Sequence, residues 1–184
     1  MRVLGFDPGT ATTGYGVVDG KGTSLRHVAH GAIRTPAGLD FAKRLRMIFE
    51  EARRLIECHE PDAVAIEKIF FSQNVTTGIA VAQARGVLAL AAELAGKPLG
   101  EFSPLEVKSA VVGYGKARKQ QVQEMVKILL NLDAVPRPDD AADALALAIC
   151  QVQSGAVSER LEDAHREMEE AYREKGASRR KSGK

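Results

Sequence analysis

The sequence has few of the residues that indicate a disulfide framework or a zinc site. Its 184 residues include only two cysteines, Cys58 and Cys150, which are far apart and belong to no Cys-x-x-Cys pair. Such isolated cysteines predict buried, reduced thiols rather than disulfides. The four histidines show no metal-ligand spacing that we recognise. A histidine metal site is therefore not expected.

Long apolar runs and a strong net charge are also missing. No run is long enough to span a bilayer, and the first residues resemble a strand rather than a signal peptide. A cytosolic protein is the default expectation. The net charge of +2 includes four basic residues at 176–184, where there is no acid, which leaves −2 for the rest of the chain. A nucleic acid would therefore have to bind to a local basic patch or to this tail.

What the sequence does contain is ordinary for one soluble globular domain, with 45% apolar and 27% charged residues. Its organising stretch is 2–16, RVLGFDPGTATTGYG. The apolar run at 3–6 predicts a buried strand that ends at Asp7, and Pro8-Gly9 turns the chain. An acid at the end of a central strand lies where α/β proteins bind ligands. Asp is also a common turn residue, so Asp7 alone leaves both interpretations open.

Hydrophobic periodicity predicts the remaining elements. The expected strands are 15–19, 23–33 (with poor alternation), 63–66 and 99–102, and the expected helices are 39–59, 75–95, 103–112, 117–132, 140–153 and 157–175. Three antiparallel strands followed by alternating helix and strand predict an α/β fold with a mixed sheet. We expect one domain over 1–155, followed over 156–184 by a charged helix and a disordered basic tail.

Acidic residues gather at two kinds of position. Glu67 follows the strand at 63–66, so it joins Asp7 at one edge of the sheet if the two strands are adjacent. Asp140 and Asp143 are three residues apart in the first turn of an apolar helix, so they share a face of it. Asp139 and Asp143 are four residues apart and also share a face. We interpret Asp139 as the N-cap because it follows a proline directly. Capping and the helix dipole explain one or two of these acids, and three less well.

Four carboxylates close together would repel one another unless cations were bound. Oxygen ligands without histidine or cysteine favour Mg²⁺ or Mn²⁺. Two such ions about 4 Å apart can activate water and stabilise a leaving oxygen in phosphodiester cleavage. The acids therefore predict a metal-dependent nuclease site.

The chain resembles the RuvC-type Holliday junction endonucleases, a bacterial family of the RNase H-like nuclease superfamily, over residues 1–155. The resemblance depends on several motifs together: FDPGTATTGYGVV at 6–18, AIEKIFFSQN at 65–74, QARG at 83–86, VKSAVVGYGKARKQQVQEMV at 107–126 and DDAADALALAIC at 139–150. It implies an RNase H-like mixed five-stranded sheet flanked by helices on both faces. It also implies paired, symmetric cleavage of junction strands in recombination and repair, which leaves a 5′-phosphate and a 3′-hydroxyl.

The resemblance also assigns residues. The four metal-holding positions of the family fall on Asp7, Glu67, Asp140 and Asp143, so it favours Asp140 over Asp139 as a ligand. It implies two Mg²⁺ ions, replaceable by Mn²⁺, with Asp7 bridging both.

The DNA contacts implied by the resemblance involve one aromatic residue and a basic patch. Phe70 matches a position that stacks on unpaired bases. Lys108 and Lys119 match positions that contact the DNA backbone, and Lys116 and Arg118 add charge beside them. The alternative for Phe70 and Phe71 is that one of the two packs in the core. The alternative for the basic residues is that they form a solvated helix face.

The implied partners are four-way junction DNA, a second copy of the chain through the helix at 75–95, and the RuvA–RuvB branch-migration complex. Two other classes compete. DPGTATTG resembles the phosphate loop of actin-like and sugar-kinase-like ATPases, but those proteins need about twice this length and a second loop. A non-catalytic junction-binding module would be expected to have lost an acid, and none is lost here.

Overall fold

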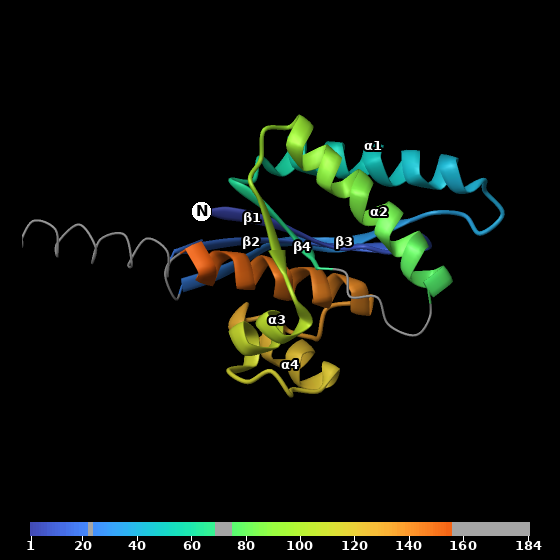
Figure 1. Cartoon of the computed structure of the whole chain (residues 1–184). Coiled ribbons are helices and arrows are strands. Elements are labelled where there is room, and N and C mark those ends of the chain that lie inside the picture. Colours follow the sequence, from blue (N-terminus) through green and yellow to red (C-terminus); the bar gives the residue numbers. More distant parts are fainter. Residues whose placement is uncertain (22–23, 69–74, 156–184) are drawn as a thin grey trace, which may run out of the picture.

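The computed structural model describes residues 1–21, 24–68 and 75–155. Its centre is a five-stranded sheet of order β3-β2-β1-β4-β5 (Figure 1). The strands are β1 (Arg2–Asp7), β2 (Thr12–Lys21), β3 (Ser24–Arg34), β4 (Ala63–Glu67) and β5 (Leu99–Phe102). The first three pair antiparallel, whereas β4 is parallel to both β1 and β5. The predicted mixed α/β sheet is confirmed.

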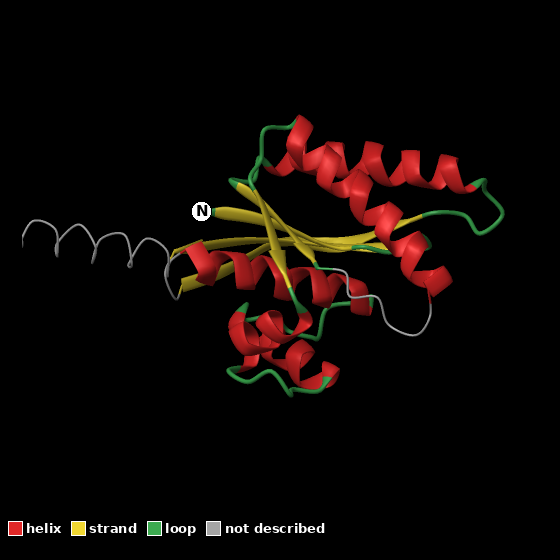
Figure 2. Cartoon of the chain, viewed as in Figure 1, coloured by secondary structure: helices red, strands yellow, loops and turns green. Residues whose placement is uncertain are grey.

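Helices cover both faces of this sheet (Figure 2). On one face lie α1 (Phe41–His59) and α2 (Val75–Leu94). On the other lie α3 (Pro104–Val112), α4 (Lys119–Leu129) and an unlabelled helix at residues 139–155, orange in Figure 1. We call this unlabelled helix the 139–155 helix. No helix in the described part of the chain is long and apolar enough to cross a membrane.

Alternating side chains of the central strands supply two separate cores. Leu4 and Phe6 of β1 are fully buried in the core that α1 and α2 complete. Val3, from the same strand, is buried in the core shared with α3, α4 and the 139–155 helix. This two-sided burial explains why β1 is a nearly continuous apolar run.

Several element boundaries differ from the prediction for local reasons. β2 is longer than the predicted 15–19, and its pairing with β3 shifts register between Val17 and Val18. That bulge explains the poor alternation of the third strand, because a bulge interrupts the two-residue period. The helix predicted at 103–112 is present as α3, and Ser103 and Glu106 form a capping box at its start.

The prediction of two buried thiols is half wrong. Cys150 is buried, but Cys58 is exposed. The buried side of α1 includes Leu55 and Ile56. Cys58 follows Ile56 by two residues, and at 3.6 residues per turn this places it on the opposite side of the helix.

Candidate active site

Two of the predicted acids stand at the ends of neighbouring strands. In the parallel pairing of β1 and β4, Phe6 is opposite Ile66. The next residue on each strand is an acid, Asp7 on β1 and Glu67 on β4. The expected adjacency of Asp7 and Glu67 at one edge of the sheet is therefore confirmed.

Glycines in β1 and β2 bring the third acidic segment to the same edge. A Cβ atom on Gly5 would lie 2.1 Å from the backbone oxygen of Ala144, and one on Gly14 would lie 1.9 Å from that of Asp140. Only glycine therefore permits the 139–155 helix to pack this closely on the sheet. Because Gly14 pairs with Asp7, the first turn of that helix reaches the end of β1.

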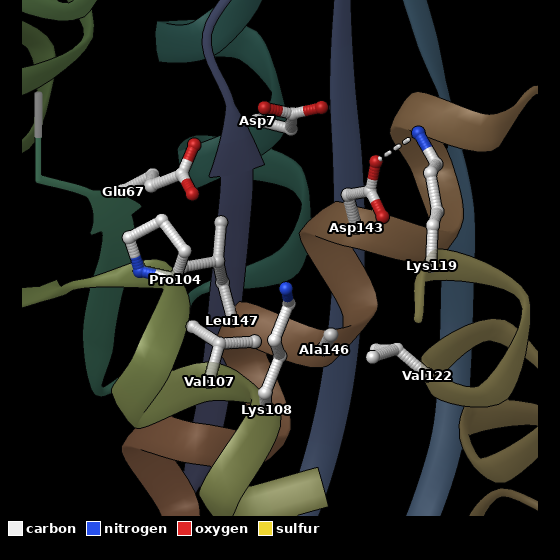
Figure 3. Close-up of a pocket in the computed structure, with 10 residues that line it drawn as sticks. All are labelled: Asp7, Glu67, Pro104, Val107, Lys108, Lys119, Val122, Asp143, Ala146 and Leu147. Atoms are coloured by element: carbon white, nitrogen blue, oxygen red, sulfur yellow. Dashed lines mark ion pairs between the residues drawn. The ribbon is translucent and has the colours of Figure 1, made fainter. Parts of the chain in front are cut away.

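These acids open into one pocket with a volume of about 280 Å³, shown in Figure 3. Its lining combines three carboxylates, two lysines and an apolar floor: Asp7, Glu67, Asp143, Lys108, Lys119, Pro104, Val107, Val122, Ala146 and Leu147. The carboxylates come from β1, β4 and the 139–155 helix, and the lysines come from α3 and α4 (Figure 3). Segments that are far apart in the sequence therefore build a single site.

The electrostatics of the pocket reflect burial and mutual repulsion. Burial raises the pKa of Asp7 to about 8, and the charges of Asp143, Glu67 and Asp140 add to the shift. Burial also raises the pKa of Glu67, with a further contribution from Asp143. Asp7 therefore retains its proton at neutral pH unless a cation offsets the neighbouring charges.

Lys119 supplies part of that positive charge. Its Nζ lies 2.7 Å from Oδ2 of Asp143 and 4.0 Å from Oδ2 of Asp139. Burial raises the pKa of the Asp143 carboxyl, and the hydrogen bond from Lys119 opposes that rise. The charges of Lys108 and Lys119 offset part of the rise in the pKa of Glu67.

The donor set fits a hard divalent cation in chemistry but is not preassembled. Carboxylate oxygens are the ligands that Mg²⁺ and Mn²⁺ prefer, and the repulsion among these acids would be relieved by such an ion. Within residues 1–21, 24–68 and 75–155, however, no three acidic, histidine or cysteine side chains are placed to hold a metal. Asp143 is paired with Lys119 instead (Figure 3).

Comparison with known proteins adds an independent line of evidence. Residues 3–151 match the family model described as Crossover junction endodeoxyribonuclease RuvC. This chain belongs to the RuvC family. A Brevibacillus brevis protein named crossover junction endodeoxyribonuclease RuvC is 56% identical over 153 residues, which are 83% of this chain and 92% of the relative.

Solved structures agree with this family and with the fold. T. thermophilus RuvC in complex with Holliday junction substrate superposes with a TM-score of 0.82 at 33% identity, covering 86% of this chain and 96% of that one. The yeast mitochondrial Holliday junction resolvase Ydc2 has a TM-score of 0.62 at 15% identity, with coverage of 82% and 78%. The likeness to Ydc2 supports the fold alone.

The structure separates the predicted DNA-contacting residues into groups. Lys108 and Lys119 line the carboxylate pocket itself. Lys116 and Arg118 are exposed just before α4. Phe70 lies outside the described residues.

The acids of the 139–155 helix differ from one another in placement. Asp143 lines the pocket, whereas Asp140 does not, although its charge contributes to the raised pKa of Asp7. Asp139 was predicted as the N-cap, but the helix already begins at Asp139. The backbone carbonyl of Pro138 accepts the hydrogen bond from Ala141 N–H, and the Asp139 carboxylate pairs with the preceding arginine.

Arg85 is a residue that the sequence analysis missed. It lies on α2, and its Nε donates a hydrogen bond to the backbone oxygen of Glu67 at 3.2 Å. The available signals were the QARG motif at 83–86, for which no role was predicted, and a single arginine in a helix otherwise rich in glycine and alanine. Periodicity cannot indicate which strand end such a side chain reaches.

Proposed function

We propose that this chain is a structure-selective endonuclease that resolves Holliday junctions by hydrolysing phosphodiester bonds in two opposed strands, in recombination and repair. The observation that carries the proposal is the convergence of Asp7, Glu67 and Asp143 on one pocket that two lysines also line. Membership of the RuvC family, and the junction substrate named for T. thermophilus RuvC, support the same activity.

Nucleases of this family are metal-dependent. We assign metal binding here to Asp7, Glu67, Asp140 and Asp143, and propose two Mg²⁺ ions with Mn²⁺ as a substitute. When bound, such ions supply Lewis acidity that activates water and stabilises the leaving oxygen. Because burial and neighbouring charges raise the pKa of Asp7, its carboxyl must lose its proton before it can serve as a ligand.

The lysines of the pocket have a complementary role. Lys108 and Lys119 flank the carboxylates, so they attract the phosphate backbone to a site whose acids alone would repel it. The exposed Lys116 and Arg118 extend this charge outward from the pocket. We assign stacking on unpaired bases at the crossover to Phe70, as the family pattern implies.

We further propose that the chain acts as a homodimer through α2. Three large apolar side chains of this helix are exposed: Ile79 (50%), Leu90 (49%) and Leu94 (66%). With the exposed Gln83 and Gly86 they follow a helical spacing of three or four residues, and a Cβ atom on Gly86 would meet nothing within 4 Å. Such a stripe, with a glycine at its centre, fits a second helix approaching closely.

Symmetric pairing would suit the two-fold symmetry of a four-way junction. A cytoplasmic location and a partnership with the RuvA–RuvB branch-migration complex remain predictions from the family resemblance. Residues 156–184, for which we predicted a charged helix and a disordered basic tail, lie outside the described part of the chain.

The deciding experiment is cleavage of a synthetic four-way junction with Mg²⁺. We expect paired nicks from the wild-type chain and none from Asp7→Asn, which should still bind the junction. Asp40→Asn is the matched control, because Asp40 is an exposed acid next to α1 that pairs with Lys43. Near-normal nicking by Asp7→Asn would refute the metal role of Asp7.

The same assay separates the competing classes. Binding without cleavage by the wild-type chain would indicate a non-catalytic junction-binding module. ATP hydrolysis without DNA, together with an uncut junction, would favour the ATPase alternative.

A further inference from the structure

Arg85 connects α2 to the ends of two parallel strands. Besides its hydrogen bond to the Glu67 carbonyl, its Nη2 lies 2.5 Å from Oε1 of Glu101 on β5. The Arg85 side chain is 22% exposed, which is far less than the arginines of the surface ion pairs on α1. One guanidinium therefore holds a helix and two neighbouring strands together where β4 ends.

The contact with Glu67 is made from the face of the sheet opposite the pocket. Ile66 is buried in the core under α1 and α2. Because strand residues alternate between faces, the carboxylate of Glu67 points to the other face, where it lines the pocket. Arg85 is absent from that lining and from the charges that shift the pKa of Glu67. It acts on the main chain of Glu67 and leaves the carboxylate accessible.

The contact between Arg85 and Glu67 lies at the last residue of β4, where strand pairing ends. The pairing of β4 with β5 ends with Glu67 opposite Phe102, and Lys68 N–H donates to the Phe102 carbonyl at 2.8 Å. Beyond this point the regular strand ladder no longer fixes the backbone. The Arg85 hydrogen bond therefore restrains the residue that carries the pocket carboxylate at the end of its strand.

We propose that Arg85 is a positioning residue, which fixes the backbone of Glu67 so that its carboxylate projects into the metal-binding pocket. The inference rests on the proposed function, in which Glu67 holds metal. Arginine suits this role because its planar fork donates in two fixed directions at once, toward the Glu67 carbonyl and toward Glu101. A lysine ammonium lacks that fixed fork.

The test compares Arg85→Met and Arg85→Lys with Arg53→Met, in which an arginine is removed from an exposed ion pair with Glu57 on α1. Calorimetric titration with Mn²⁺, without DNA, measures metal affinity, and junction nicking gives kcat and KM. Loss of an outer-shell partner typically lowers metal affinity or activity by about 10- to 100-fold. We expect a loss in this range for Arg85→Met in Mn²⁺ affinity and kcat, with KM changed by less than about twofold.

Arg85→Lys should show a smaller loss of both, and Arg53→Met should behave like the wild-type chain. Wild-type Mn²⁺ affinity and kcat in a folded Arg85→Met would overturn the positioning role alone. If Arg85→Met does not fold, a folded Arg85→Lys with normal Mn²⁺ affinity would overturn it equally. A wild-type chain that neither binds Mn²⁺ nor nicks junctions would overturn the proposed function as well.

Discussion

Lys119 and Asp143 form an ion pair inside the carboxylate pocket, with Nζ 2.7 Å from Oδ2. Lys119 is the first residue of α4, and Asp143 is the fifth residue of the 139–155 helix. The Lys119 ammonium is therefore paired with one of the carboxylates that we assign to metal binding. A divalent ion at this carboxylate would compete with Lys119 for the same oxygens.

We predict that Lys119→Met binds Mn²⁺ more tightly than the wild-type chain in the absence of DNA. The side chain of Lys119 is 51% exposed, and a half-exposed pair contributes up to about 1 kcal/mol. The expected gain is therefore up to about fivefold in affinity, measured by calorimetry. Junction nicking should nevertheless fall, because a phosphate contact is lost.

Lys116→Met is the matched control, since Lys116 is exposed outside the pocket. It should leave Mn²⁺ affinity unchanged. Weaker Mn²⁺ binding by Lys119→Met would show that the ammonium organises the carboxylates rather than competing for them.

The raised pKa of Asp7 predicts a pH-dependent stability of the metal-free chain. The folded pKa is about 8, against an ordinary value of 3.8. Between these values the folded state binds more protons than the unfolded state, so this contribution is complete below about pH 4 and is lost as the pH rises through 8. One pKa unit corresponds to about 1.4 kcal/mol, so we expect a loss of at least that size.

Asp7→Asn removes this contribution to the pH dependence. In EDTA, its melting temperature should exceed that of the wild-type chain by more at pH 9 than at pH 5, as measured by scanning calorimetry. The melting temperature of Asp40→Asn should differ from that of the wild-type chain by the same amount at both pH values. An equal offset for Asp7→Asn at the two pH values would contradict the prediction.

Gly14→Ala should separate the acids without removing any of them. The added Cβ would lie 1.9 Å from the Asp140 backbone oxygen, so the 139–155 helix must move away from the sheet. Overpacking of this kind costs about 1–3 kcal/mol. We expect a lower melting temperature and loss of junction nicking.

Gly38→Ala is the control, because a Cβ atom there would meet nothing within 4 Å. It should retain both the stability and the nicking of the wild-type chain. Normal nicking by a folded Gly14→Ala would show that the close packing of this helix is dispensable for the site.

Much of this arrangement was predictable because it depends on local patterns. The apolar runs that end at Asp7 and Glu67 identified both strand ends, and hydrophobic periodicity identified the segment that forms α3. The order of three antiparallel strands followed by alternating helix and strand was enough to predict the mixed sheet. The signals for the individual strands and helices lie within the segments that they predict, and the sheet prediction needed only the order of those segments.

What the sequence could not provide were contacts between segments far apart in the chain. Nothing near Lys119 indicates that it pairs with Asp143, and nothing near Arg85 indicates that it reaches the carbonyl of Glu67. The glycines raised the same difficulty. Nothing near Gly14 indicates that its structural role is to admit the backbone of another helix.

The last prediction concerns the exposed stripe on α2. Leu90→Arg places a charge beside Gly86, where a second helix would have to approach. We expect this variant to be a monomer and the wild-type chain to be a dimer, as measured by light scattering. On a cruciform plasmid the wild-type chain should give linear product from paired cuts, and Leu90→Arg should give mainly nicked circles. Ile128→Arg is the control, because Ile128 is 66% exposed on α4 and lies outside the stripe. A dimeric Leu90→Arg would place the interface elsewhere, because a buried arginine without a partner is not tolerated at the centre of an apolar contact.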